Sequence, residues 1–256
     1  MRGAETVVKT GPLRESADRI TGNLKEKGSP MRGRHLPGLI VAGGLAAVLS
    51  VSALINIGQS ARSSASSASA AASVQLDGQQ ARALHDAMRK LWEEHVLWTR
   101  LFIVSDVAGL PDLQATTARL LANQSDIGNA IKPFYGSANG DHLTSLLMQH
   151  ILQAAQILAD AKLGKSTAVA QDEQAWYANA SEIATFLHSL NPQFWSLAAL
   201  QAMMKKHLDL TLTEAVDQLQ GGYTASVAEF DAVENEILGM ADTLSSGIIA
   251  QFSQNS

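Results

Sequence analysis

Apolar residues recur at intervals of three and four along most of the chain after residue 78, which is the spacing of one face of an α-helix. No strand-like alternation competes with this pattern, and Gly and Pro fall mainly between the periodic segments. The spacing predicts helices over residues 79–105, 111–122 with a second piece at 125–131, 141–163, 169–189, 195–220 and 223–252. We therefore expect an all-α fold, an antiparallel bundle of about six helices with a core like that of a four-helix bundle.

A different pattern precedes the bundle. Residues 36–58 are apolar and carry no Asp, Glu, Lys or Arg, and at about 1.5 Å per residue they are long enough to cross a hydrocarbon layer of about 30 Å. Residues 1–35 contain 8 basic and 4 acidic side chains, so the positive-inside rule predicts a cytoplasmic N-terminus. The chain would then be a single-pass protein of the bacterial cytoplasmic membrane.

This organisation divides the chain into four parts. We expect a mostly disordered basic tail over residues 1–35, a transmembrane helix over 36–58, a linker rich in Ser and Ala over 59–78, and an extracytoplasmic bundle over 79–253. The alternative is translation from Met31, followed by cleavage of the apolar segment near Val51-Ser52-Ala53 as a signal peptide, which would give a secreted form.

The composition of the chain limits the kinds of partner that it is expected to bind. The chain has 19 Lys and Arg against 24 Asp and Glu, and this net charge of -5 disfavours binding to nucleic acid. The absence of Cys excludes disulfides, thiolate metal sites and cysteine nucleophiles. The expected partners are membrane lipid around residues 36–58 and either a second copy of the chain or an unidentified envelope protein.

Three histidines occupy core-type positions of three different predicted helices. His95, His150 and His207 each lie within about three residues of the middle of their helix, as do Asn179 and Glu234. Midpoints of packed helices of similar length lie at one level of a bundle, whichever way the helices run. These imidazole, amide and carboxylate groups are therefore expected to converge.

Convergent imidazoles and carboxylates are the ligands that first-row transition metals prefer. The sequence suggests one Zn, Cu, Fe or Ni ion, because the Glu-x-x-His motif of di-iron bundles does not occur. The predicted ligands are His95, His150, His207 and one or both of Asp231 and Glu234, supported by Glu94, Thr99, Asn179 and Glu214 around them.

The expected function is thus a membrane-anchored, extracytoplasmic bundle that binds or senses a metal ion, and no motif supports catalysis. The alternative is a bundle that senses another ligand or contacts a protein partner. In that reading the His, Asn and carboxylate layer is a hydrogen-bonded core that fixes helix register.

Several short sequence segments resemble a family of small bacterial all-helical proteins, many without an assigned function. They are Leu91-Trp-Glu-Glu-His-Val-Leu-Trp-Thr-Arg100, Phe134-Tyr-Gly136, Trp176-Tyr-Ala-Asn-Ala180, Asn191-Pro192, His207-Leu-Asp-Leu-Thr211 and Met240-Ala-Asp242. The resemblance extends over about residues 80–252. It implies an autonomous helical domain and no particular reaction.

Overall fold

The computed structural model describes residues 75–253, and within this range the regular structure is entirely helical. The six helices are α2 (Gly78–Ala108), α3 (Leu113–Tyr135), α4 (Ser137–Lys162), α5 (Ser166–Leu190), α6 (Leu197–Leu219) and α7 (Tyr223–Phe252). The predicted all-α bundle is confirmed. Residues 1–74, which include the predicted tail, transmembrane helix and most of the linker, lie outside the described residues.

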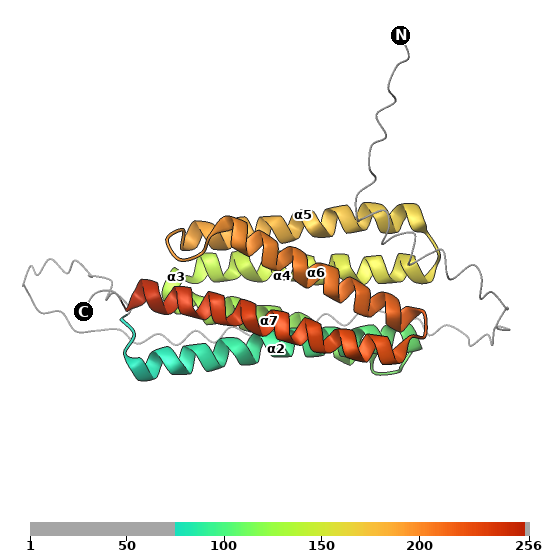
Figure 1. Cartoon of the computed structure of the whole chain (residues 1–256), viewed down its shortest axis with the longest axis horizontal. Coiled ribbons are helices and arrows are strands. Elements are labelled where there is room, and N and C mark those ends of the chain that lie inside the picture. The colour runs from blue at the N-terminus through green and yellow to red at the C-terminus, as the bar shows by residue number, and fades with distance from the viewer. Residues whose placement is uncertain (1–74, 254–256) are drawn as a thin grey trace, which may run out of the picture. The chain divides into compact units, whose positions relative to one another are not determined.

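Each helix packs against the next one in the chain, and α2 packs against α7, so the six helices form a closed ring. Short connections make consecutive helices antiparallel, and α6 runs obliquely to α4 and α5 (Figure 1). The α2–α3, α4–α5 and α6–α7 connections therefore share one end of the bundle. The N-terminus of α2 and the C-terminus of α7 share the other.

Local capping sets where α2 begins and ends. The Asp77 carboxylate accepts hydrogen bonds from the backbone N–H groups of Gln79 and Gln80, and the Gln80 side chain accepts one from the Asp77 backbone N–H. Gly109 ends the helix with φ at 63°, a left-handed conformation that glycine adopts without strain. Three residues beyond the predicted end at 105 are thus helical.

The second helix differs from its prediction. We expected a break after residue 122, but α3 is continuous from Leu113 to Tyr135. Asn123 and Gln124 are fully buried at the expected break, and their side chains donate hydrogen bonds to the carbonyl oxygens of Leu91 and Leu120. These bonds offset the cost of burying two amides, so the helix continues.

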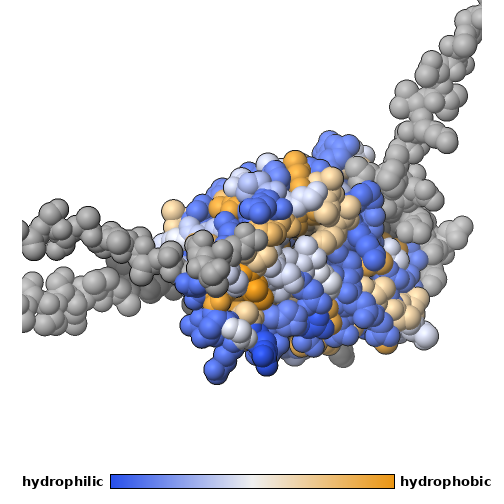
Figure 2. Space-filling view, turned by 60° about the vertical axis from the view of Figure 1, so that its left-hand side comes forward, coloured by the Kyte–Doolittle hydropathy of each residue, from blue (hydrophilic) through white to orange (hydrophobic). Residues whose placement is uncertain are grey.

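The core contains mostly Leu, Ile, Val and Met, together with the buried rings of Trp92, Trp176 and Trp195. The face of the bundle visible in Figure 2 is mostly hydrophilic, with apolar residues in separate groups. This is the distribution expected of helices that bury one apolar face against each other.

No helix formed by residues 75–253 has both the length and the hydropathy that crossing a membrane requires.

We predict that the fragment from Gln75 to Ser256, the bundle fragment, folds without the rest of the chain, because its helices bury a core of their own. Far-ultraviolet circular dichroism should show a strongly helical spectrum and one cooperative thermal transition. A weak helical signal, or a gradual loss of signal on heating, would contradict this.

Candidate functional site

A layer of buried polar side chains crosses the bundle near its middle, and every described helix contributes to it. Its members are at most 8% exposed, and we call them the polar layer: His95 of α2, Gln124 of α3, His150 of α4, Asn179 of α5, His207 of α6 and Glu236 of α7. The predicted convergence of the three histidines and Asn179 is therefore what the fold produces.

Contacts within the polar layer are direct. The ring centroids of His95 and His207 lie 5.7 Å apart, and His207 Nδ1 lies 3.5 Å from Glu236 Oε2. Asn179 donates from Nδ2 to the Leu146 carbonyl, which turns its Oδ1 toward His150 Nδ1 at 2.9 Å. Since an amide oxygen only accepts, His150 Nδ1 must carry the proton of this hydrogen bond.

The environment keeps two of these imidazoles neutral. Burial lowers the pKa of His95 well below 6.5; the nearby His207 and His150 lower it further, and a contact with Gln124 opposes this. Burial lowers the pKa of His150 to about 3, again with a contribution from His207 and against the hydrogen bond to Asn179. Neutral imidazoles can be buried together because they do not repel one another.

The carboxylate in the layer differs from the two predicted. Asp231 is exposed and Glu234 is half-buried, whereas Glu236 is buried against His207. As predicted metal ligands, Asp231 and Glu234 would both have to lie on the inner face of α7. The face that packs inward instead carries Val233, Ile237, Met240 and Leu244.

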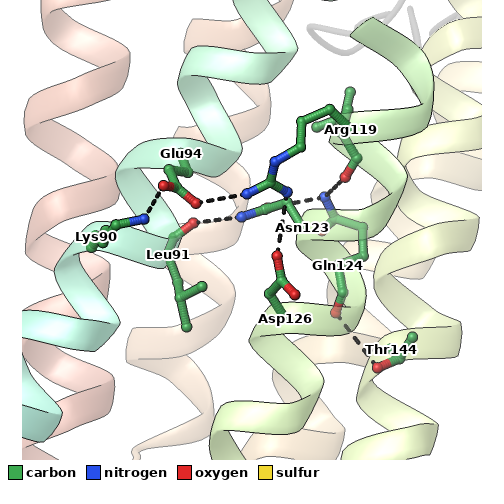
Figure 3. Close-up of polar contacts among 9 residues, drawn as sticks. Lys90, Leu91, Glu94, Arg119, Asn123, Gln124, Asp126 and Thr144 are labelled. Carbon is green, nitrogen blue, oxygen red and sulfur yellow. Dashed lines mark hydrogen bonds and ion pairs between the residues drawn. The ribbon is translucent and has the colours of Figure 1, made fainter. Parts of the chain in front are cut away.

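The residues predicted to support the metal ligands have other partners. Glu94 lies at the α2–α3 surface, where it pairs with Lys90 and with Arg119, which also contacts Asp126 (Figure 3). Thr99 donates to the His95 carbonyl at 2.7 Å. Of the four predicted supporting residues, only Asn179 belongs to the polar layer.

Glu214 forms a separate buried ion pair with Arg100. Arg100 Nη1 lies 2.6 Å from Glu214 Oε1 and also donates to the Ser226 carbonyl. Burial raises the pKa of Glu214 to about 7, and the ion pair with Arg100 opposes this rise. The pair joins α2, α6 and the start of α7, so we assign it a structural role.

Sequence reasoning missed the contribution of α3. Asn123 and Gln124 hydrogen-bond to each other, and the Gln124 carbonyl accepts from Thr144 Oγ1 on α4 at 3.5 Å (Figure 3). The polar sequence Asn123-Gln-Ser-Asp126 suggests an interruption of the helix rather than a buried segment. The only available signal was that these amides lie near the middle of the segment from Leu113 to Tyr135.

In the part of the chain that the structure describes, no group of three or more His, Asp or Glu side chains is arranged to hold a metal ion. His150 Nδ1 is engaged by Asn179, and His207 faces Glu236. The residue types in the polar layer are ones that bind transition metals, but their side chains are not arranged as a metal site. The metal site therefore stays a prediction.

That prediction has a direct test. If one ion binds, Zn, Cu, Fe or Ni should raise the Tm of the bundle fragment, because a ligand that binds the native state stabilises it. Replacing His95, His150 or His207 with Ala should remove most of the rise, whereas replacing His85 should not. An unchanged Tm with every metal would favour a purely hydrogen-bonded polar layer.

An apolar cavity of about 50 Å³ lies beside the polar layer. Five helices line it, with Thr99, Phe102 and Ile103 from α2, Leu120 from α3, Ile151, Ala154, Ile157, Leu158 and Ala161 from α4, Trp176 from α5, and Thr211, Leu212, Ala215, Val216 and Leu219 from α6. We call it the α4–α6 cavity, because these two helices supply most of its wall.

Trp176 lies between the cavity and the polar layer. Its ring lines the cavity, and its centroid lies 5.1 Å from that of His150 at an angle of 31°. Thr211 also lines the cavity and follows His207 by one helical turn. Within residues 75–253, neither Thr211 Oγ1 nor Trp176 Nε1 has a hydrogen-bond partner, although both are buried. Buried groups of this kind usually have a partner, so these two atoms are exceptions within the core.

One buried carboxyl group is unpaired. Glu173 of α5 is fully buried, and neither of its oxygens has a hydrogen-bond partner among the described residues. Burial raises its pKa to about 7. Glu173 precedes Trp176 by three residues but does not line the cavity, so we do not include it in the site.

Comparison with known proteins adds no family to this description. No protein family model, curated protein or solved structure matches the chain. The resemblance to small bacterial helical proteins therefore stays a prediction.

Proposed function

We propose that the bundle is a binding module for a small apolar ligand, which occupies the α4–α6 cavity. The observation that carries this proposal is the composition of the cavity, whose walls come from five helices and are almost entirely apolar. Ligand sites are typically apolar hollows with a few placed polar groups, and they often lie between the helices of bundles.

The polar layer supports this proposal as a structural element. Its groups come from all six described helices and hydrogen-bond or stack across them, so they favour one register of the bundle. A fixed register keeps Trp176 and Thr211 in place beside the cavity. The layer then positions the binding site and is not itself the site.

We further propose that residues 36–58 anchor the chain in the cytoplasmic membrane and hold the bundle outside. The charge-free apolar run and the basic residues before it support this orientation. Protease added to intact spheroplasts should remove an epitope tag inserted at position 65. Protection of the tag would show that this segment lies inside the cell.

Ligand binding is tested by thermal denaturation with two apolar probes of different shape, decanol and naphthol. A probe that binds the native state raises its stability, by about 2.7 kcal/mol at a concentration 100 times its Kd. We expect at least one of the two to raise the Tm of the protein. The substitution Ala215→Phe, which fills the cavity, should abolish the rise in Tm. The control Ala118→Phe, at an exposed position of α3, should leave the rise unchanged. No rise with either probe would contradict the proposal.

A further inference from the structure

We propose that an exposed apolar patch on α2 and α7 binds an amphipathic helix of a partner protein, one whose apolar stripe is flanked by Lys or Arg. Five side chains define this surface, which we call the α2–α7 patch: Leu97 and Leu101 of α2, Leu110 just after α2, and Tyr223 and Val227 of α7. None of them lines the α4–α6 cavity, so this interaction is separate from the proposed ligand binding.

Exposed apolar side chains gather in this part of the bundle. Each member of the patch is at least 40% exposed, and among residues 75–253 only two other large apolar side chains, Leu152 and Leu163, are exposed to this degree. Single exposed apolar residues are normal on a protein surface, whereas several in one place usually mark an interaction site. The α2–α7 patch is therefore a candidate interface.

The two helices bring these side chains together around Arg100. Arg100 Nη1 donates to the Ser226 carbonyl at 3.1 Å, and the guanidinium carbon lies 5.1 Å from the centre of the Phe230 ring. The two leucines on α2 lie before and after Arg100 in the sequence, and Val227 directly follows Ser226. Residues four apart lie on the same side of a helix, so the leucine pair and the pair of Tyr223 and Val227 form two neighbouring apolar rows.

Carboxylates border the patch. Glu93 comes one helical turn before the first leucine of the patch, and Asp231 and Glu234 lie one and two turns after Val227. None of these three carboxylates forms an ion pair with another residue in the range 75–253. This range carries 10 Lys and Arg against 20 Asp and Glu, a net charge of -10. The patch thus favours a partner with positive charge beside its apolar residues.

This charge distinguishes the possible occupants. A second copy of the chain would bring the same acidic border against itself, and a membrane rich in anionic lipid would be repelled in the same way. A helix with an apolar stripe packs against two neighbouring helices by the same interdigitation of side chains that forms the bundle. Lys or Arg beside that stripe would lie close to Glu93, Asp231 and Glu234.

The test measures binding of labelled peptides to the full-length protein in phosphatidylcholine nanodiscs by fluorescence anisotropy, with empty nanodiscs as the blank. Three peptides of about three heptads are compared: one with Leu at a and d and Lys at e and g, one with Glu at e and g instead, and a scrambled form of the first. We expect the Lys peptide to bind about ten times more tightly than either of the others, and more weakly as salt is raised to about 1 M. Equal binding of the Lys and Glu peptides, or no binding of any, would overturn the proposal.

Matched substitutions show where the Lys peptide binds. Leu101→Gln should weaken its binding about tenfold, because it removes an apolar contact within the patch. Leu152→Gln, at a more exposed position on α4, should leave binding unchanged. Asp231→Asn should weaken binding of the Lys peptide about threefold at low salt and strengthen that of the Glu peptide. Equal losses from Leu101→Gln and Leu152→Gln would show that the peptide does not bind at the patch.

Two further outcomes would assign the patch to another occupant. A dimer of the full-length protein that Leu101→Gln separates would show that a second copy covers the patch. Removal of residues 1–35 that tightens binding of the Lys peptide about tenfold or more would show that the basic tail of this chain covers it. Either result would overturn a separate partner protein.

Discussion

Replacing Gly247 with Ala is expected to destabilise the bundle by about 3 kcal/mol, because the added methyl group would overlap a buried indole ring. A Cβ at this position would lie 2.0 Å from Trp195 Nε1 and 2.5 Å from its Cδ1. Trp195 is only 1% exposed, and its carbonyl lies 2.7 Å from His188 Nδ1, so the ring cannot move without disturbing its surroundings. Guanidinium denaturation of the bundle fragment measures the loss.

Gly239 provides the matched control in the same helix. A Cβ there would meet nothing within 4 Å, and the position is exposed. Gly239→Ala should therefore stabilise the bundle by up to about 1 kcal/mol through helix propensity alone. Opposite signs for the two substitutions would support the close approach of α7 to Trp195. A similar gain at both positions would show that α7 does not pack there as described.

Replacing Glu173 with Gln is expected to stabilise the bundle by about 3 kcal/mol at pH 8 and to change little at pH 4. Burial raises the pKa of Glu173 from 4.5 to about 7. The unfolded chain thus loses its proton at a lower pH than the native state does, and stability falls as pH rises from about 4.5 to 7. At roughly 1.4 kcal/mol for each tenfold difference in acidity, this loss reaches about 3 kcal/mol above pH 7. Gln remains neutral and avoids it.

Denaturation of the bundle fragment across this pH range would show the effect. Glu182→Gln, at an exposed position of α5, is the control and should change stability by less than about 0.5 kcal/mol at both pH values. A gain from Glu173→Gln that is the same at pH 4 and pH 8 would contradict the burial of an ionisable, unpaired carboxyl group. A gain of the expected size would show that Glu173 lowers the stability of the fold at neutral pH.

The two predictions concern different parts of the same bundle. Gly247 and Trp195 lie toward the end where the described chain starts and finishes, and their packing maintains the core there. Glu173 lies one turn from Trp176, near the proposed ligand.

The helices themselves were predictable from the sequence. Apolar residues at intervals of three and four, with Gly and Pro between the segments, placed five of the six described helices within about four residues of their ends. His95, His150, Asn179 and His207 could be placed at one level because the middle of a helix can be counted along the sequence. These features depend on local periodicity, which every helix carries in its own residues.

Only the tertiary structure decided which face of α7 turns inward. This helix is apolar over much of its circumference, as in Ile237-Leu238 and Met240-Ala241, so its sequence allows more than one rotation about the helix axis. Packing against α2 and α6 selects the rotation of α7 that buries Glu236 and leaves Asp231 exposed. For the same reason, the sequence could not show that Asn123 and Gln124 are buried, because their partners lie on other helices or depend on an unbroken α3.

The α4–α6 cavity also arises only in the folded bundle. Its walls are ordinary core residues such as Ile157, Leu158 and Val216, which in the sequence are indistinguishable from residues that pack without a gap. A cavity forms where the side chains of several helices do not fill the space between them, and that depends on how the helices cross. The sequence by itself therefore determined the helices and the level of their polar residues, and the packing of one helix against another determined the site.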